Sequence, residues 1–202
     1  MQLDHLAVAG ETLSEAVAHV EQALGVAMQP GGQHPRYGTH NRLIGLMDGL
    51  YLEAIAIEPG VVPENQPRWF DLDNFKGPAR LTNWILRSPS LEQEAETLLP
   101  HARQLVAMQR GDLRWLMTVP VDGLLPYENL YPAVLEWQGR LPVESLAPTG
   151  CRLLRLTIRH PDGNALGADV APILKDQKIA FEAGPHGMSA EFETPHGRRV
   201  LE

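Results

Sequence analysis

The chain has 202 residues, of which 44% are hydrophobic and 21% charged, a balance typical of one globular domain or two small fused modules. Its formal net charge is -8, so we expect neither a nucleic-acid surface nor an anionic membrane surface, because both need clustered lysine and arginine. The single cysteine, Cys151, cannot form an internal disulfide. The sequence shows neither a secretory leader nor an apolar run of about 20 residues. We therefore expect a cytoplasmic protein, without membrane attachment, whose partner is a small molecule.

The first predicted unit begins with a short strand followed by a helix. The helix starts at a capping box formed by Thr12 and Glu15 and ends at Gly25. The Pro-Gly-Gly sequence at 30–32 predicts a turn. The pair Asp48-Gly49 is typical of a tight hairpin between two further strands. Three of its strands are predicted over residues 2–8, 40–46 and 50–57, and we assign the unit the order βαβββ.

The same order returns from Arg80, with a strand, a helix opened by Ser90 and Gln93, and three short strands. These three strands are predicted near 105–108, 112–119 and 131–138. The helix caps follow the first strands at the same offset in both units. His5 of the first unit is therefore level with Asn83 of the second.

A third, shorter copy begins at Arg152, where RLLRLTIRHP aligns without a gap on RLTNWILRSP. It predicts a helix near Asn164 to Lys175, followed by strands over 178–182, 188–194 and 198–201. We expect an α+β protein in which two βαβββ modules, residues 1–58 and 79–139, form a cupped mixed sheet within residues 1–150. Residues 151–202 are expected to form a C-terminal extension packed on it.

The crossover between the two units is rich in proline and carries three aromatic residues, Trp69, Phe70 and Phe75. Two interpretations remain open for this segment. It is either a lid over a site or an ordered connection that lets one unit pack on the other.

Polar side chains recur at matching places on the flanking strands of each unit. Because successive side chains of a strand point to opposite faces, His5 and Glu53 can converge in the first unit, as Asn83 and Glu136 can in the second. A carboxylate within an apolar strand is costly unless it is paired, protonated or bound to a cation. Nitrogen and oxygen donors of this kind suit a divalent first-row metal.

A second interpretation gives the same residues a structural role. Glu53 and Glu136 would then form salt bridges with Arg42 or Arg114 at the sheet surface, and His5 would be an ordinary half-buried histidine.

Another polar cluster contains His40, Asn41 and Arg42. These residues either orient an anionic substrate at the rim of the pocket or hold the hairpin through side-chain to backbone hydrogen bonds. Trp137 is expected to form part of the pocket wall against the substrate.

Four segments, LDHLAVAG, HPRYGTHNRLIGL, YLEAIAI and LPYENLYPAVLEW, resemble the glyoxalase-like group of the vicinal oxygen chelate superfamily. In that superfamily, paired βαβββ modules surround a divalent metal whose ligands lie on the first and last strands of each module. The resemblance implies that His5, Glu53 and Glu136 are metal ligands. Asn83 stands where the superfamily often has a second histidine or a glutamine, and we assign it with His40, Asn41, Arg42 and Trp137 to substrate binding.

The resemblance implies a lyase or isomerase that uses zinc, nickel, manganese or iron to act on a small oxygenated molecule, with Glu136 as the base. The alternative is a metal-free protein that binds a small molecule in the same cup. A homodimer would cover the edges of the repeated sheets. The competing fold is a ferredoxin-like array of order βαββαβ, in which His5 and Glu53 would not converge.

Overall fold

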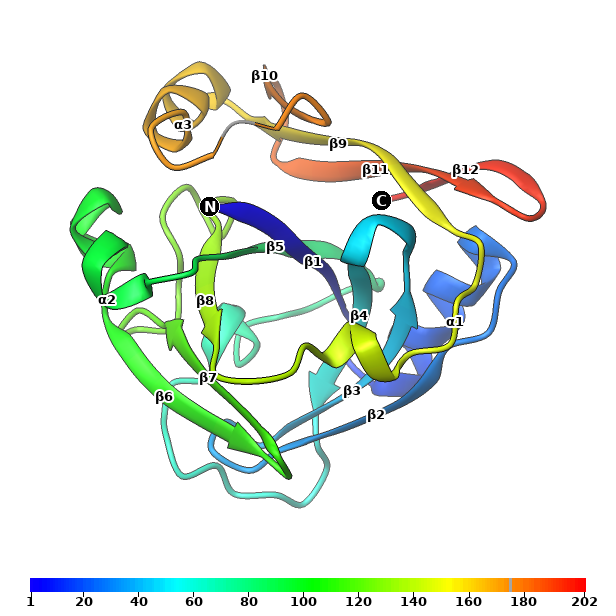
Figure 1. Cartoon of the computed structure of the whole chain (residues 1–202), viewed down its shortest axis with the longest axis horizontal. Coiled ribbons are helices and arrows are strands. Elements are labelled where there is room, and N and C mark those ends of the chain that lie inside the picture. Colours follow the sequence, from blue (N-terminus) through cyan, green and yellow to red (C-terminus); the bar gives the residue numbers. More distant parts are fainter. Residues whose placement is uncertain (175) are drawn as a thin grey trace.

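The computed structural model describes residues 1–174 and 176–202 (Figure 1). Its main body is a curved sheet built from two units of equal order, and a second sheet lies along one side of it. The first unit consists of β1 (Gln2–Ala9), α1 (Leu13–Leu24), β2 (Gln29–His34), β3 (Thr39–Gly45) and β4 (Tyr51–Ile57). The second unit consists of β5 (Arg80–Arg87), α2 (Leu91–Glu94), β6 (Leu105–Arg110), β7 (Leu113–Thr118) and β8 (Ala133–Trp137).

The main sheet has eight strands in the order β2-β3-β4-β1-β5-β8-β7-β6. Its two halves are equivalent, since the first strand of each unit pairs in parallel with the last, β1 with β4 and β5 with β8. The halves meet where β1 pairs antiparallel with β5. This arrangement confirms the α+β fold of paired βαβββ modules and differs from a ferredoxin-like array. The sheet curls until β2 and β6, at its two ends, lie near each other (Figure 1).

Helix α1 begins and ends at the predicted residues. Thr12 Oγ1 accepts a hydrogen bond from the Glu15 backbone N–H at 3.2 Å, and a Glu15 carboxylate oxygen accepts one from the Thr12 backbone N–H at 2.9 Å. At the other end, Gly25 adopts the left-handed conformation with φ 72°. The hairpin between β3 and β4 is confirmed as well, with both Asp48 and Gly49 left-handed.

The Pro-Gly-Gly sequence at 30–32 is not a turn, as the sequence predicted, but lies within β2. Its pairing with β3 shifts register between Pro30 and Gln33. A Cβ atom on Gly31 would lie 2.1 Å from Asn41 Oδ1, and one on Gly32 would lie 2.6 Å from Arg110 Cδ. Because glycine has no side chain, these two positions allow Asn41 and Arg110 to pack directly against the β2 backbone.

The second predicted helix is much shorter than expected. Only Leu91–Glu94 is α-helical, and 3-10 turns follow at Ala95–Thr97 and Pro100–Ala102. Proline disfavours helical backbone in the residue before it, and Leu99 accordingly has ψ 140°. The Ser90 side chain makes no capping hydrogen bond.

The C-terminal segment forms a separate sheet in the order β10-β9-β11-β12. Its elements are β9 (Arg152–His160), α3 (Gly163–Val170), β10 (Ile179–Ala183), β11 (Gly187–Thr194) and β12 (Gly197–Leu201). The order of elements matches the other units, but β9 pairs in parallel with the strand directly after the helix. The predicted helix ends at Val170 rather than extending to Lys175, which lies outside the described residues. The change of sheet near residue 150 supports the domain boundary that we propose there.

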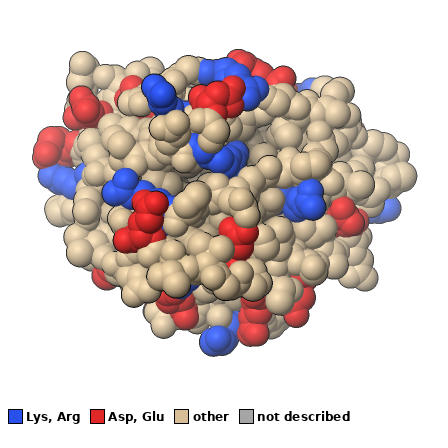
Figure 2. All heavy atoms as spheres, turned by 90° about the horizontal axis from the view of Figure 1, so that it is seen from below, with Lys and Arg blue, Asp and Glu red and all other residues tan. Residues whose placement is uncertain are grey.

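The second sheet packs on the first through β12 against α1 and β11 against β5. On the face in Figure 2, acidic and basic side chains are interspersed over a largely uncharged surface. None of the helices in the described ranges is long and apolar enough to cross a membrane.

Candidate functional site

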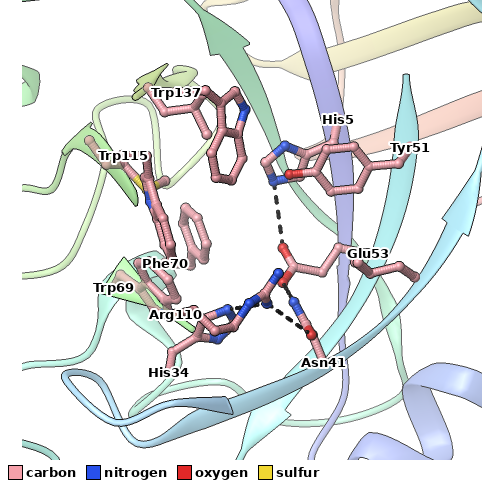
Figure 3. A pocket seen from close by; sticks show the side chains of 13 residues that line it. His5, His34, Asn41, Tyr51, Glu53, Trp69, Phe70, Arg110, Trp115 and Trp137 are labelled. Carbon is pink, nitrogen blue, oxygen red and sulfur yellow. Dashed lines mark hydrogen bonds and ion pairs between the residues drawn. The ribbon is translucent and has the colours of Figure 1, made fainter. Parts of the chain in front are cut away.

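A narrow cavity lies inside the cup, with about 30 Å³ of free space, close to the volume of one water molecule (Figure 3). Both units contribute to its walls, as does the crossover segment between them. Its aromatic lining comes from Tyr51, Trp69, Phe70, Trp115 and Trp137, and its polar lining from His5, His34, Asn41, Glu53 and Arg110.

His5 on β1 lies between two carboxylates. Its Nδ1 is 2.7 Å from Asp4 Oδ1, and its Nε2 is 3.6 Å from Glu53 Oε2. The ring stacks on Tyr51 with centroids 4.3 Å apart. Burial lowers the pKa of His5, but Asp4 and Glu53 outweigh this effect and raise the pKa to about 8. His5 is therefore an imidazolium at neutral pH, with an N–H directed at each carboxylate.

Glu53 on β4 is the ionised partner of His5. Burial raises its pKa, but the contact with His5 and the hydrogen bond donated by Asn41 Nδ2 lower the pKa to about 2. The cost of burying this carboxylate is therefore met by a neighbouring cation and an amide donor.

Asn41 joins this pair to a second cluster across the cup. Its Oδ1 accepts hydrogen bonds from the Gly32 backbone N–H at 2.7 Å and from Arg110 Nη1 at 3.3 Å. Arg110 Nη1 also lies 2.9 Å from His34 Nε2. Burial and the Arg110 cation lower the pKa of His34 to about 4, so His34 Nε2 is a neutral acceptor.

Asp4 fixes the other side of the site. Besides His5, it accepts a hydrogen bond from Trp137 Nε1 at 3.1 Å and lies 3.6 Å from Arg87 Nη1. The buried Asp4 carboxylate on β1 thus contacts Arg87 of β5 and Trp137 of β8.

The structure brings four of the predicted site residues together at the cavity, namely His5, Asn41, Glu53 and Trp137. His40 and Arg42 are placed differently, because they alternate with Asn41 along β3 and face the other side of the sheet. The cluster 40–42 that the sequence suggested is therefore divided between two faces.

Glu136 and Asn83 also lie away from the cavity. Glu136 alternates with Leu135 and Trp137, which line it, and a Glu136 carboxylate oxygen accepts a hydrogen bond from the Leu91 backbone N–H at 2.6 Å. Asn83 is buried beside Asn129, whose Nδ2 lies 3.4 Å from Asn83 Oδ1. The predicted convergence of these two residues with His5 and Glu53 does not occur.

The register of the sheet explains the different position of Glu136. Glu53 pairs with Ala7 in the first unit. The sequence match that equates His5 with Asn83 makes Ile85 of β5 the equivalent of Ala7, and Ile85 pairs with Ala133. Ala133 is therefore the counterpart of Glu53.

Sequence reasoning missed Asp4 and Arg110 as parts of the site. Arg110 had an available signal, because it shares a face of β6 with the buried Val106 and Met108. Asp4 had none, since a register shift between Leu3 and His5 places it beside His5.

The residues present do not fit the divalent metal that the resemblance implied. Of the three predicted ligands only His5 and Glu53 converge. No group of three His, Cys, Asp or Glu side chains suited to a metal occurs among residues 1–174 and 176–202. The Arg110 cation also lies one side chain away from Glu53, where it disfavours a further positive charge. Two ligands fall short of the three or four that zinc sites use.

The family model of the glyoxalase-like domain matches residues 3–174, and the chain belongs to this family. This match confirms the resemblance to vicinal oxygen chelate proteins. A search of curated proteins found no match.

Solved structures are similar to this chain at low sequence identity. A hypothetical protein from Staphylococcus aureus is 11% identical, with 92% of this chain and 86% of that chain covered and a TM-score of 0.62. Methylmalonyl-CoA epimerase from Mycobacterium tuberculosis is 15% identical, with 71% and 91% covered and a TM-score of 0.45. The Streptomyces coelicolor methylmalonyl-CoA epimerase in complex with 2-nitronate-propionyl-CoA is 14% identical, with 69% and 99% covered and a TM-score of 0.42.

Proposed function

We propose that the cup binds a small planar organic molecule that carries a carboxylate, and that His5 and Glu53 exchange protons with it. The observation that supports this function is the convergence of an imidazolium, a carboxylate and a guanidinium on one aromatic cavity. Aromatic walls favour a planar body, and the charged groups favour a polar, oxygenated one.

Arg110 is the proposed anchor for the carboxylate. Its Nη1 contacts only neutral partners, His34 and Asn41. In the part of the chain that the structure describes, no Asp or Glu oxygen lies within 4.0 Å of its guanidinium nitrogens. A guanidinium without an anion at the edge of a cavity suits a carboxylate, which it binds through two parallel hydrogen bonds.

The cavity must enlarge to admit such a molecule, since its free space matches about one water molecule. Arg110 is the side chain best placed to move, because it is partly exposed and ends β6 directly before the turn at Gly111. We propose that its guanidinium turns toward the ligand and leaves the space that it occupies in the cup.

The His5–Glu53 pair supplies the proposed chemistry. Glu53 would remove a proton from carbon beside a carbonyl group, and the electron pair of that C–H bond would move to the carbonyl oxygen. His5 would give its Nε2 proton to that oxygen. Once His5 is neutral, Glu53 loses its cationic partner and binds the proton more strongly. Glu53 then gives its proton to a neighbouring carbon while an enol O–H returns a proton to His5, which restores the carbonyl group and both residues and completes an isomerisation.

One observation favours binding without chemistry as a second candidate function. His5 and Glu53 already neutralise each other, and both are almost completely buried. Such an ion pair can equally be a structural support for a ligand site.

The test uses metal-free protein, dialysed against chelator, with planar 2-oxo acids and aromatic carboxylates as probes. Thermal shift and calorimetry measure binding, and NMR in D₂O measures exchange of the C–H proton beside the carbonyl group. We expect Arg110→Gln to weaken binding at least tenfold and the exposed control Arg114→Gln to leave it unchanged. Absence of binding by every probe would contradict the proposal.

Glu53→Gln separates the two candidate functions. We expect it to retain binding within a few fold and to abolish exchange, while the exposed control Glu193→Gln exchanges at the rate of the unaltered protein. If the unaltered protein binds the probes but does not exchange their C–H proton, the result supports the second candidate function, binding without chemistry.

A further inference from the structure

A second and larger cleft lies where the two sheets meet, with a volume of about 710 Å³. Its lining comes from the crossover segment, the start of β5, the loop before β8 and the turn between β10 and β11. We infer that this cleft binds a planar organic monocarboxylate, at a site separate from the cup and independent of the function proposed there. Its volume lies within the range of small-molecule sites.

Arg80 supplies the unpaired positive charge of this cleft in the described part of the chain, since Arg159, which also lines it, forms an ion pair with Glu182 at 3.2 Å. Its Nη1 donates hydrogen bonds to the carbonyl oxygens of Lys76 and Pro78, both at 3.0 Å, and its Cζ lies 4.3 Å from the centroid of the Phe75 ring. These contacts hold the guanidinium in place and leave its other nitrogens available. Within the described residues, no carboxylate oxygen lies within 4.0 Å of Arg80. The cation is therefore positioned without an anionic partner.

Thr82 supplies a hydroxyl group beside it. Residues 80 and 82 share one face of β5, roughly 7 Å apart along the strand, and both line the cleft. Thr82 Oγ1 is buried without a hydrogen-bond partner in the part of the chain that is described. An unsatisfied buried hydroxyl costs roughly 1–3 kcal/mol. Because Thr82 Oγ1 has almost no exposed surface, a ligand oxygen would recover this energy once rotation about χ1 turns the hydroxyl into the cleft.

The remaining lining indicates the shape and charge of the ligand. Phe75, Leu124 and Met188 form apolar walls that suit a flat hydrocarbon body. Three acidic residues also line the cleft, Asp71, Glu128 and Glu202. Asp71 accepts a hydrogen bond from Asn74, and Glu128 lies 3.7 Å from His160 Nε2. Their negative charge disfavours a second anionic group on the ligand, which is why we infer a monocarboxylate.

The cleft and the cup share one lining residue, Phe70. Phe70 has a left-handed backbone with φ 59°, and its carbonyl oxygen accepts a hydrogen bond from Asn129 Nδ2 at 2.8 Å. Asn129 in turn ends a run of three left-handed residues, 127–129. Backbone strain of this kind persists where the surrounding structure fixes it, and it is concentrated at functional sites.

Methionine methyl groups allow each site to be observed separately, because Met188 lines the cleft and Met117 lines the cup. The experiment titrates full-length protein, labelled with ¹³C at the methionine methyl groups, with 2-naphthoate and with the uncharged naphthalene-2-carboxamide. We expect a saturable shift of the Met188 signal with 2-naphthoate and at least tenfold weaker binding of the amide. A shift confined to Met117 would contradict binding in the cleft and support binding in the cup. Absence of a saturable Met188 shift with either probe would also contradict binding in the cleft.

Matched variants identify the residues responsible. We expect Arg80→Gln to weaken the Met188 response at least tenfold, Thr82→Val to weaken it several-fold, and the exposed control Arg198→Gln to leave it unchanged. Arg110→Gln, on the cup, is also expected to leave it unchanged. Circular dichroism and thermal unfolding check that each variant folds. Equal responses in folded Arg80→Gln and unaltered protein would overturn the assignment of the anion site.

Discussion

The Arg110 side chain runs through the space that a Cβ atom on Gly32 would need, since that atom would lie 2.6 Å from Arg110 Cδ. Arg110 belongs to β6 and Gly32 to β2, the two ends of the eight-stranded sheet. The arginine therefore reaches His34 and Asn41 only because a residue without a side chain stands in its path.

The two adjacent glycines of β2 are expected to differ in their response to alanine. In Gly32→Ala the methyl group meets a flexible arginine, which can move away, so we expect a loss of less than about 1 kcal/mol in unfolding free energy. In Gly31→Ala it meets Asn41 Oδ1 at 2.1 Å and the Asn41 backbone oxygen at 2.4 Å. There we expect a loss of about 2–3 kcal/mol. Urea unfolding measures both, and equal losses would contradict the prediction.

The two buried histidines of the cup predict opposite effects of pH on stability. The pKa of His5 is about 8 in the folded protein and about 6.5 in the unfolded chain. The protonated ring therefore contributes its full share to the free energy of unfolding below pH 6.5, and this share is lost as pH rises through 8. The pKa of His34, about 4, lies below the unfolded value, so stability is lost as pH falls from 6.5 through 4. The losses are about 2 and 3 kcal/mol.

Urea unfolding between pH 3.5 and 9 measures these effects. His5→Gln should remove the alkaline loss and, because Glu53 then lacks its cationic partner, should also change the acidic side. His34→Gln should reduce the acidic loss and leave the part that comes from Glu53, whose pKa is about 2. If either variant kept the slope assigned to its histidine, the assignment would be wrong.

Asp4 is predicted to support the charge of His5. Asp4→Asn removes a buried anion that contacts His5 and Trp137, so we expect a loss of about 2–3 kcal/mol in stability and a fall in the pKa of His5. Asp122→Asn is the matched control, because Asp122 forms a comparable contact with His101 at 3.0 Å but more than half of each side chain is exposed. It should cost no more than about 0.5 kcal/mol. NMR titration of the His5 ring and urea unfolding provide the two readouts.

Glu136→Gln should affect stability and leave ligand binding by the cup unchanged. Its carboxylate accepts a charge-assisted hydrogen bond from the Leu91 backbone N–H on the other face of β8, so we expect a loss of about 1 kcal/mol in unfolding free energy. Glu144→Gln, in an exposed position, controls for the loss of one charge. A tenfold loss of ligand affinity in Glu136→Gln would show that this residue acts in the cup after all.

Local signals made much of the fold predictable. Helix α1 has a capping box at one end and Gly25 at the other, and the hairpin after β3 contains Asp48-Gly49. Each of these signals depends on residues close together in the sequence. The repeat of the two units was inferred from the equal offset between the first strand and the helix start, although the Ser90 side chain makes no capping hydrogen bond.

The site was less predictable because it depends on how distant strands align. Matching the sequences of the two units placed Glu136 level with Glu53, whereas strand pairing makes Ala133 its counterpart. Arg110 enters the cup across the gap between the ends of the sheet, a contact that period-two alternation alone cannot specify. The crossover 58–78, for which the sequence left a lid and an ordered connection open, places Trp69 and Phe70 in the cavity wall, where both are buried.

Pro30 has a consequence for how the protein behaves among other copies of itself. It lies on β2, the strand at one end of the sheet, and has no backbone N–H to donate to a neighbouring strand. The register of β2 with β3 shifts directly after it, between Pro30 and Gln33. Such a strand is a poor template for a strand from another molecule, so the feature protects this edge against aggregation. β2 and β6 are the two unpaired ends of the same sheet, and the gap between them is bridged by a side chain, since Arg110 Nη1 lies 2.9 Å from His34 Nε2.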